Sequence, residues 1–284
     1  MIGPDRLARV TAAAVVPEQV VGYVRAVAGS RPRMFGACVG YESDAEVVLV
    51  GYPLHDPTDG NAMAAAVDEA LRAPGLERIT VIAPARPQQA PPSAHTAEDR
   101  YYALQLPPPA PGQKLRNLLR RAGREVTLVS GRRVEADHAD LVRRFIDERP
   151  LAAGTRRIFL RVANYVEASA GSLIVSARRK DGSLAAFAVG EFAALSTAFF
   201  MFCFRDSDIA PPGSADLAFS GLVQEAQLRG QSRMNLGLGV SDGIRFFKRK
   251  WGAEPYLPYV ETSWQPSGAG LLSRLRGLLA RDLR

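Results

Sequence analysis

Short apolar runs alternate with polar turns along the chain, and they predict a mixed α/β protein. The run 184–204 carries a single charge, Glu191, and is long enough to span a bilayer. The Asp181-Gly182 turn signal before it and a short break within it favour two buried strands instead, at 184–192 and 196–204. A transmembrane span is the less favoured alternative, because a lone glutamate inside the bilayer is costly.

The spacing of apolar positions predicts the remaining elements. Strands are expected at 36–42, 46–52, 78–83, 100–106, 125–130, 172–179, 233–238 and 256–264. Helices are expected at 61–72, 113–123, 135–149, 156–168 and 214–229, with a short basic helix after residue 243. No element is assigned before residue 36.

The two halves of the chain resemble each other. Val67-Asp-Glu-Ala70 and Val223-Gln-Glu-Ala226 each end a helix that follows a Pro/Gly/Asp loop and precedes a strand. Chance likeness between amphipathic helices is the alternative, but the match covers strand, loop, helix and strand, which favours a tandem duplication. We expect a first repeat at 1–112, a second at 113–266 and a basic amphipathic tail at 267–284.

Composition excludes some classes of protein. The 284 residues are 47% hydrophobic, enough for two domains, and the two cysteines and three histidines show no metal-ligand spacing. The absence of a Gly-x-Ser-x-Gly elbow argues against a hydrolase of that type. A net charge of +7 favours phosphate-bearing partners, or simply reflects an arginine-rich proteome. Without a signal-peptide pattern, we expect a cytoplasmic protein.

The stretch 235–253 joins a strand end, a glycine-rich turn and a basic helix, a combination that suits a bound anion. Gly237, Gly239 and Gly243 match neither the dinucleotide fingerprint nor the nucleotide P-loop. The alternative is an ordinary corner with a solvated basic face.

Several short motifs resemble the GNAT acyltransferase fold, and within it the FemABX-type aminoacyl transferases and the C-terminal domain of phosphatidylglycerol lysyltransferases. They span about residues 100–262. The motifs are Lys114-Leu-Arg-Asn117, the hairpin 181–191, Pro212-Gly-Ser214, Asn235-Leu-Gly237, Phe247-Lys248 and Trp251-Gly-Ala253. The resemblance implies tandem GNAT-like repeats, with mixed, mostly antiparallel sheets and flanking helices.

The same resemblance implies an acyltransferase or aminoacyltransferase. Its donor would be a phosphorylated carrier, acyl-CoA or aminoacyl-tRNA, and its acceptor an amine or hydroxyl. The GNAT pyrophosphate signature, Arg/Gln-x-x-Gly-x-Gly/Ala, is absent, which puts an acetyl-CoA donor in doubt. No tightly bound cofactor and no metal are expected. The alternative is a non-catalytic protein of this fold that binds RNA or anionic lipid.

Acyl transfer needs a base, and Glu191 is the first candidate because desolvation at the end of an apolar strand would raise its pKa. Asp206 and Tyr256 are weaker candidates. For the carrier we expect Gly213, Ser214, Asn235, Gly237, Lys248 and Lys250. Lys248 and the helix start at Ser214 should face one cleft, where free backbone N–H groups favour a phosphate. Ser214 is alternatively an ordinary N-cap.

The tail 271–284 places leucines on one side of a helix and arginines largely on the other. Such a helix suits an anionic membrane surface, a partner, or its own domain. We therefore expect either a cytoplasmic protein or one peripheral to the inner face of the membrane. The sequence does not predict an oligomeric state.

Overall fold

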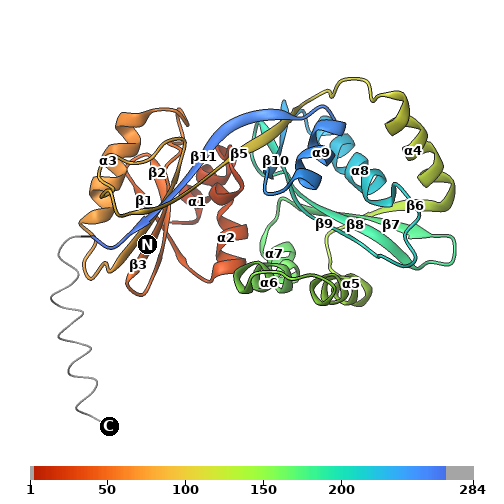
Figure 1. Cartoon of the computed structure of the whole chain (residues 1–284), viewed down its shortest axis with the longest axis horizontal. Helices are drawn as coiled ribbons and strands as arrows, with labels where there is room; N and C mark the ends of the chain where they lie inside the picture. Colours follow the sequence, from red (N-terminus) through yellow and green to blue (C-terminus); the bar gives the residue numbers. More distant parts are fainter. Residues whose placement is uncertain (1–2, 267–284) are drawn as a thin grey trace, which may run out of the picture. The chain divides into compact units, whose positions relative to one another are not determined.

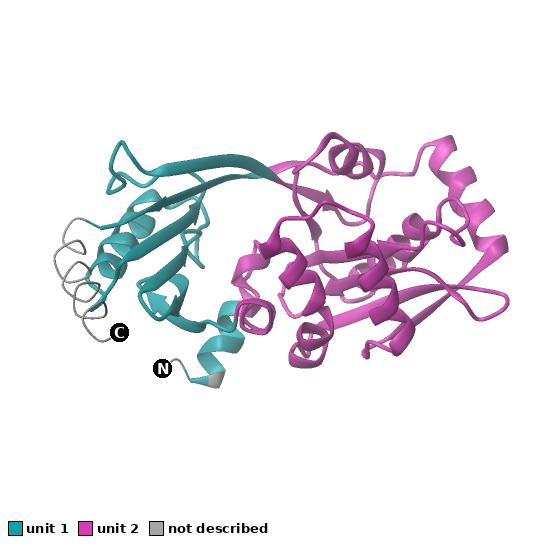
Figure 2. Cartoon of the chain, turned by 60° about the horizontal axis from the view of Figure 1, so that its bottom comes forward, with its two compact units in different colours: residues 1–10, 29–100, 257–284 teal, residues 11–28, 101–256 magenta. Residues whose placement is uncertain are grey.

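A computed structural model describes residues 3–266, and its chain forms two compact units (Figures 1 and 2). Of the described residues, unit 1 takes 3–10, 29–100 and 257–266, and unit 2 takes 11–28 and 101–256. Strands β5 (His95–Gln105) and β11 (Glu254–Trp264) carry the chain from one unit to the other. The two units therefore meet within these two strands, and residues 11–28 also belong to unit 2, whereas the sequence predicted a single boundary at 112. The predicted basic tail at 267–284, with its helix at 271–284, lies outside the described residues.

Unit 1 is built on strands in the order β1-β2-β3-β4-β11 with one main helix. Its elements are β1 (Arg31–Phe35), β2 (Cys38–Ser43), β3 (Glu46–Val50), α3 (Gly60–Leu71) and β4 (Arg78–Ala83), and α1 (Pro4–Ala12) begins in it. Asp59 caps α3 by accepting hydrogen bonds from Asn61 N and Ala62 N. The apolar face of α3 then packs against β3 and β4.

Unit 2 holds a sheet in the order β5-β10-β9-β8-β7-β6, in which only β9 and β10 are parallel. Its strands are β6 (Val126–Gly131), β7 (Ser172–Arg179), β8 (Leu184–Glu191), β9 (Thr197–Arg205) and β10 (Arg233–Leu238). Every residue of β8 is buried. A strand of this kind has helices on both of its faces.

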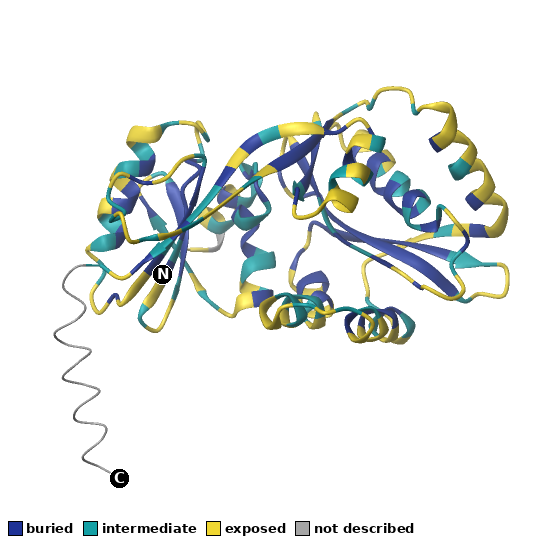
Figure 3. Ribbon diagram, in the orientation of Figure 1, coloured by how far each residue is buried: buried dark blue, intermediate teal, exposed yellow. Residues whose placement is uncertain are grey.

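Helices cover both faces of this sheet (Figure 1). One face carries α4 (Gln113–Glu125), α8 (Ser214–Leu228) and α9 (Asp242–Lys250). The other carries α2 (Val21–Ala28), α5 (Ala136–Asp147), α6 (Ala153–Leu160) and α7 (Val162–Ala168). A 3₁₀ turn, η1 (Pro17–Gln19), precedes α2. The burial pattern follows this sandwich, with buried strands between helices that expose their outer faces (Figure 3).

The predicted duplication is visible in the connections. In unit 1, β3 leads through α3 to β4, which is parallel to β3. In unit 2, β9 leads through α8 to β10, which is parallel to β9. An antiparallel hairpin, β2–β3 or β8–β9, precedes each of these crossovers. Each half therefore repeats the same β-hairpin, helix and parallel strand.

The predicted strands at 78–83 and 172–179 are confirmed as β4 and β7, and the run 184–204 forms β8 and β9. The helix predicted at 156–168 is instead two helices, because the backbone leaves helical geometry at Arg161. The elements before residue 36, namely α1, η1, α2 and β1, were not predicted. Within residues 3–266, no helix is both long and apolar enough to cross a membrane.

Candidate active site

Strands β9 and β10 run parallel but share only a short ladder, which pairs residues 233–235 with residues 197–199. β9 then continues beside β8 to Arg205, while β10 continues beside β5 to Leu238. The strands of the other crossover, β3 and β4, stay paired from Glu46 to Val50. Only the second repeat therefore opens its sheet, and backbone groups at the edges of that opening can bind a ligand.

A pocket of about 520 Å³ lies at this opening, inside unit 2. It is lined by Pro17, Glu18, Tyr23, Tyr101, Phe145, Phe159, residues 200–204, Ala215, residues 236–238, Gly243, Ile244, Phe247 and Lys248. Phe200 of β9 packs against α8 and Phe247 of α9, whereas Phe202 and Phe204 of the same strand pack with α5 and α6. The pocket therefore draws side chains from both faces of the sheet.

Glu18 is the acidic side chain of this pocket among the described residues. It sits on η1, where Pro17 starts the turn and the buried Gln19 side chain accepts hydrogen bonds from Val15 N and Val16 N. The Tyr101 hydroxyl donates to Glu18 Oε2 at 2.8 Å. A carboxylate fixed in this way inside a largely apolar pocket is suited to accept a proton from a bound acceptor.

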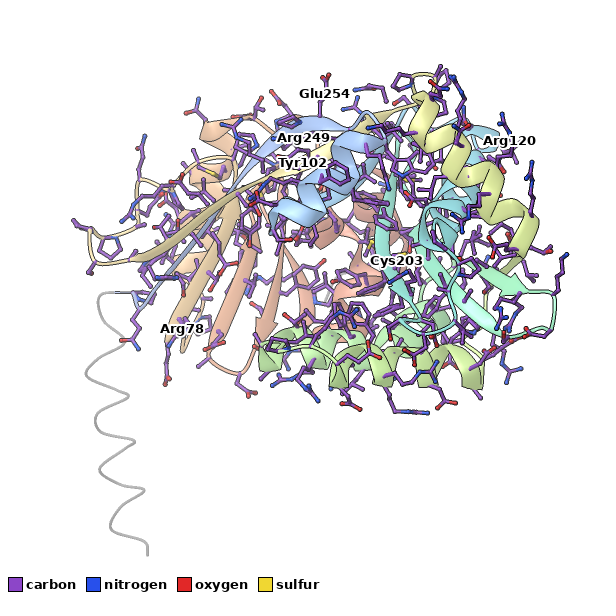
Figure 4. All side chains as sticks on the ribbon, turned by 45° about the vertical axis from the view of Figure 1, so that its right-hand side comes forward. Arg78, Tyr102, Arg120, Cys203, Arg249 and Glu254 are labelled. Atoms are coloured by element: carbon purple, nitrogen blue, oxygen red, sulfur yellow. The ribbon has the colours of Figure 1, made fainter. Side chains whose placement is uncertain are left out.

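Two neutral side chains complete the polar part of the pocket. Burial, followed by the charge of Glu18, raises the pKa of the Tyr23 hydroxyl well above its usual range. Burial also raises the pKa of the Cys203 thiol to about 12, so Cys203 stays a thiol at neutral pH and is a poor nucleophile (Figure 4). Glu18, Tyr23 and Tyr101 were not predicted as site residues, because no local motif marks them.

Lys248 lines the pocket but is only 3% exposed. Its Nζ donates to the carbonyl oxygens of Gly237 at 2.7 Å and Leu238 at 2.5 Å, at the end of β10. Gly237 has a φ of +75°, a conformation that other residues rarely adopt, and it turns the chain toward this ammonium. Lys248 thus places a positive charge in the pocket and also holds the β10–α9 connection.

The substitution Lys248→Met tests both roles. Two backbone carbonyls would lose a charged donor, so we expect the free energy of unfolding to fall by about 2 kcal/mol. Loss of the charge should also weaken binding of an anionic donor by roughly ten- to a hundredfold. Urea unfolding and isothermal titration calorimetry measure the two effects.

Arg249→Met is the matched control, because Arg249 lies next in sequence and is exposed (Figure 4). It should change neither the stability nor the donor affinity. Equal weakening by both substitutions would show that a diffuse basic surface, rather than the Lys248 site, attracts the donor.

Of the residues predicted to bind the carrier, Gly237 and Lys248 line the pocket and the others do not. Ala215, the second residue of α8, lines the pocket together with Gly237 and Lys248. Ser214 is buried and donates its hydroxyl to Pro211 O, while Gly213, with a φ of +90°, takes the N-cap position. The alternative of Ser214 as a side-chain N-cap is therefore wrong.

Asn235 and Lys250 have structural partners outside the pocket lining. The buried Asn235 amide donates to Val15 O and accepts from Gly237 N, which ties β10 to the segment before η1. The Lys250 ammonium lies 2.5 Å from Asp216 Oδ1, which also accepts from the Trp251 indole. Lys250, the last residue of α9, therefore forms an ion pair with a carboxylate of α8.

Glu191, the first candidate base, is fully buried at the end of β8 and is not among the pocket-lining residues. Its Oε2 accepts from the Tyr165 and Ser169 hydroxyls at 2.9 and 2.5 Å, and its Oε1 accepts from the backbone N–H groups of Phe192 and Ala193. A Cβ on Gly171 would lie 1.8 Å from Glu191 Oε1. This enclosure indicates a structural carboxylate.

Asp206 and Tyr256, the weaker catalytic candidates, also lie outside the pocket lining. Burial alone would raise the pKa of Asp206, but the backbone N–H groups of Ile209 and Asp208 and the Arg144 guanidinium together hold it below its usual value. Asp206 therefore shapes the turn after β9 as a carboxylate. The Tyr256 hydroxyl accepts a hydrogen bond from Arg233.

Glu135, Asp137 and His138 form the group of potential metal ligands within residues 3–266. Arg178 binds both carboxylates, at 2.8 Å from Glu135 and 2.5 Å from Asp137. His138 Nδ1 accepts from Glu135 N, so its Nε2 carries the proton toward Ser176 Oγ. Because Arg178 pairs with both carboxylates and both ring nitrogens of His138 have partners, this cluster has the character of an ion-pair network rather than a metal site.

No family model matches this sequence, and no curated protein does so at a significant level. Solved structures do match. The C-terminal domain of a protein assigned as a lysylphosphatidylglycerol synthetase of Agrobacterium fabrum is 16% identical, with a TM-score of 0.57 over 97% of this chain and 96% of that one. FemX is 9% identical, with a TM-score of 0.60 over 97% and 98%.

A tandem GNAT protein from the clavulanic acid biosynthesis pathway is 13% identical, with a TM-score of 0.50 over 92% of this chain and 94% of that one. Likeness at this level of identity speaks to the fold. Together with the repeated crossover and the mixed, mostly antiparallel strands, it agrees with the architecture expected from the motifs. The chain therefore has a tandem GNAT-like fold, of the kind found in FemX and in the lysylphosphatidylglycerol synthetase domain.

Proposed function

We propose that this protein transfers an acyl or aminoacyl group from a phosphorylated carrier to an acceptor bound in the pocket of unit 2. The opening between β9 and β10 is the observation that carries the proposal, because an extended carrier can pair there with the edge of β9 beyond Phe199, where the ladder to β10 ends. The carrier would be an acyl-CoA or an aminoacyl-tRNA. Fold likeness to FemX and to a tandem GNAT protein is consistent with this reaction class.

The pocket holds groups suited to each step of such a transfer. The first turns of α8 and α9 contribute Ala215, Gly243 and Ile244 to the lining, so two helix starts lie at the pocket. Helix starts and the Lys248 charge both stabilise phosphate or a developing oxyanion. Glu18 would then accept the proton that the acceptor loses. No step in this scheme requires a metal or a tightly bound cofactor.

Donor binding tests the proposal most directly. The full chain should be heated with acetyl-CoA, longer acyl-CoAs or charged tRNA at about a hundred times the expected Kd. Binding at that excess stabilises the folded state by about 2.7 kcal/mol, which should raise the Tm by several degrees. A rise with one donor class, followed by transfer of its labelled acyl group, would support the proposal. No rise with any donor would contradict it.

The alternative, a non-catalytic protein that binds RNA or anionic lipid, also has an observation in its favour. The outer face of α4 exposes Lys114, Arg116, Arg120, Arg121 and Arg124 (Figure 4 labels Arg120). The charge of Arg121 is offset in part by Glu125 at 3.6 Å. Such a basic face binds polyanions with a strong dependence on salt. Salt-sensitive binding of uncharged tRNA without any acyl transfer would favour this alternative.

A further inference from the structure

The pocket contains a group of five aromatic side chains, which we name the aromatic chamber: Tyr23, Phe145, Phe159, Phe202 and Phe204. They come from α2, α5, α6 and β9. Their rings meet mostly edge to face, for example Phe145 and Phe204 at 5.1 Å and 89°, and Phe159 and Phe204 at 5.4 Å and 86°. Edges and faces presented in this way are complementary to another aromatic ring.

The aromatic chamber offers no charge to a ligand. Among the described residues that line the whole pocket, Glu18 is the acidic side chain and Lys248 the basic one. The Tyr23 hydroxyl and the Cys203 thiol remain protonated, for the reasons given above. A charged side chain would therefore lose its hydration in the chamber without gaining a partner, whereas an apolar group would be stabilised there.

Glu18 lines the same pocket as the aromatic chamber. Its charge acts directly on the hydroxyl of Tyr23, and both side chains line the same pocket. The Tyr101 hydroxyl holds one oxygen of this carboxylate, and a carboxylate can accept several hydrogen bonds. A ligand that spans the two regions therefore needs a cationic group next to an uncharged, flat apolar group.

We infer that the acceptor is an arylalkyl amine, with its ring in the aromatic chamber and its ammonium group at Glu18. This inference rests on the proposed function and specifies its acceptor. It also distinguishes the pocket from one that would accept a second charged group, such as the side chain of lysine, since the chamber has no carboxylate for it.

Glu18 and the leaving group take up the two protons that the acceptor loses. The ammonium gives one proton to the Glu18 carboxylate, and the neutral amine attacks the carbonyl carbon of the donor. A C–N bond forms and the C–S bond of a thioester, or the C–O bond of an ester, breaks. The second amine proton passes to the leaving thiol or hydroxyl, and Glu18 releases its proton to water. No oxidant or reductant is needed.

Calorimetric titration of the full chain with 2-phenylethylamine, without any donor, tests the inference. Binding should be at least about tenfold tighter than that of butylamine, which has no ring, or of 1,4-diaminobutane, which has a second charge. 2-Cyclohexylethylamine separates an aromatic from a merely apolar requirement, and binding as tight as that of 2-phenylethylamine would overturn the aromatic part of the inference.

Phe159→Ala should weaken 2-phenylethylamine about tenfold, because the half-buried ring is lost from the chamber while α6 keeps its remaining contacts. Phe246→Ala is the control, since this ring on α9 is 70% exposed and does not line the pocket. Equal effects of the two substitutions would overturn the inference. Acyl transfer to another amine, with no 2-phenylethylamine binding, would overturn it too but leave the proposed function intact.

Discussion

Glu18→Gln should lower the transfer rate by about a hundred- to ten-thousandfold, which is the usual contribution of a general base. The amide keeps an oxygen that can accept the hydrogen bond from Tyr101, so the pocket should keep its shape. We therefore expect little change in the Tm and an unchanged donor affinity. Single-turnover transfer, with a donor selected by the binding test, measures the chemical step separately from binding and release.

The pH dependence of this variant is a sharper readout than its rate. In the native protein, kcat/KM should fall on the acidic side as the base becomes protonated, and Glu18→Gln should abolish that fall. Glu167→Gln serves as the control, because Glu167 is an exposed glutamate of α7 in the same unit. If Glu18→Gln keeps both the native rate and the native pH profile, the proton leaves by another route.

The strands that surround the pocket could be predicted from the sequence, because apolar runs and turn residues within each segment mark them. The run 184–204 is apolar throughout, and the Asp181-Gly182 turn fixes where its first strand begins. The repeat was detectable because α3 and α8 end with similar residues before a strand. Such patterns predict which elements form and which of them are buried. They do not predict that β9 and β10 part after three residue pairs.

The site residues depend on contacts between distant parts of the chain, which local patterns do not reveal. Glu18 meets Tyr101, a residue 83 positions later in the sequence. Lys248 was expected to serve a ligand, and it does line the pocket, but its ammonium also binds two carbonyls of the preceding turn. Glu191 was correctly placed at the end of an apolar strand, while its enclosure by α7 was not foreseen.

In a duplicated fold, one repeat can carry the functional site while the other does not. In the first repeat, β3 and β4 remain paired along five positions, and Gly51 N extends the ladder by donating to Ile82 O. In the second repeat, the Lys248 ammonium donates hydrogen bonds to the Gly237 and Leu238 carbonyls at the end of β10, in place of a neighbouring strand. The difference between the repeats is thus a difference in backbone pairing, and it confines the proposed chemistry to unit 2.

Glu191→Ala should be the most destabilising of these substitutions, lowering the free energy of unfolding by about 4 kcal/mol. Two hydroxyls and two backbone N–H groups would lose their acceptor in a site without exposure to water. Glu191→Gln should cost about half as much, since its amide can still accept from the backbone while the hydroxyls of Tyr165 and Ser169 turn to accept from its NH₂ group.

Urea unfolding of the full chain measures both changes, and Glu225→Ala provides the surface comparison. Glu225 pairs with Arg229 at 2.7 Å on the outside of α8, where such a pair contributes at most about 1 kcal/mol. If Glu191→Gln unfolds like the native protein yet loses transfer activity a hundredfold, Glu191 is the base after all. Loss of stability with activity retained in the folded fraction would instead establish that this buried carboxylate holds the end of β8 against α7 and does not serve as the base.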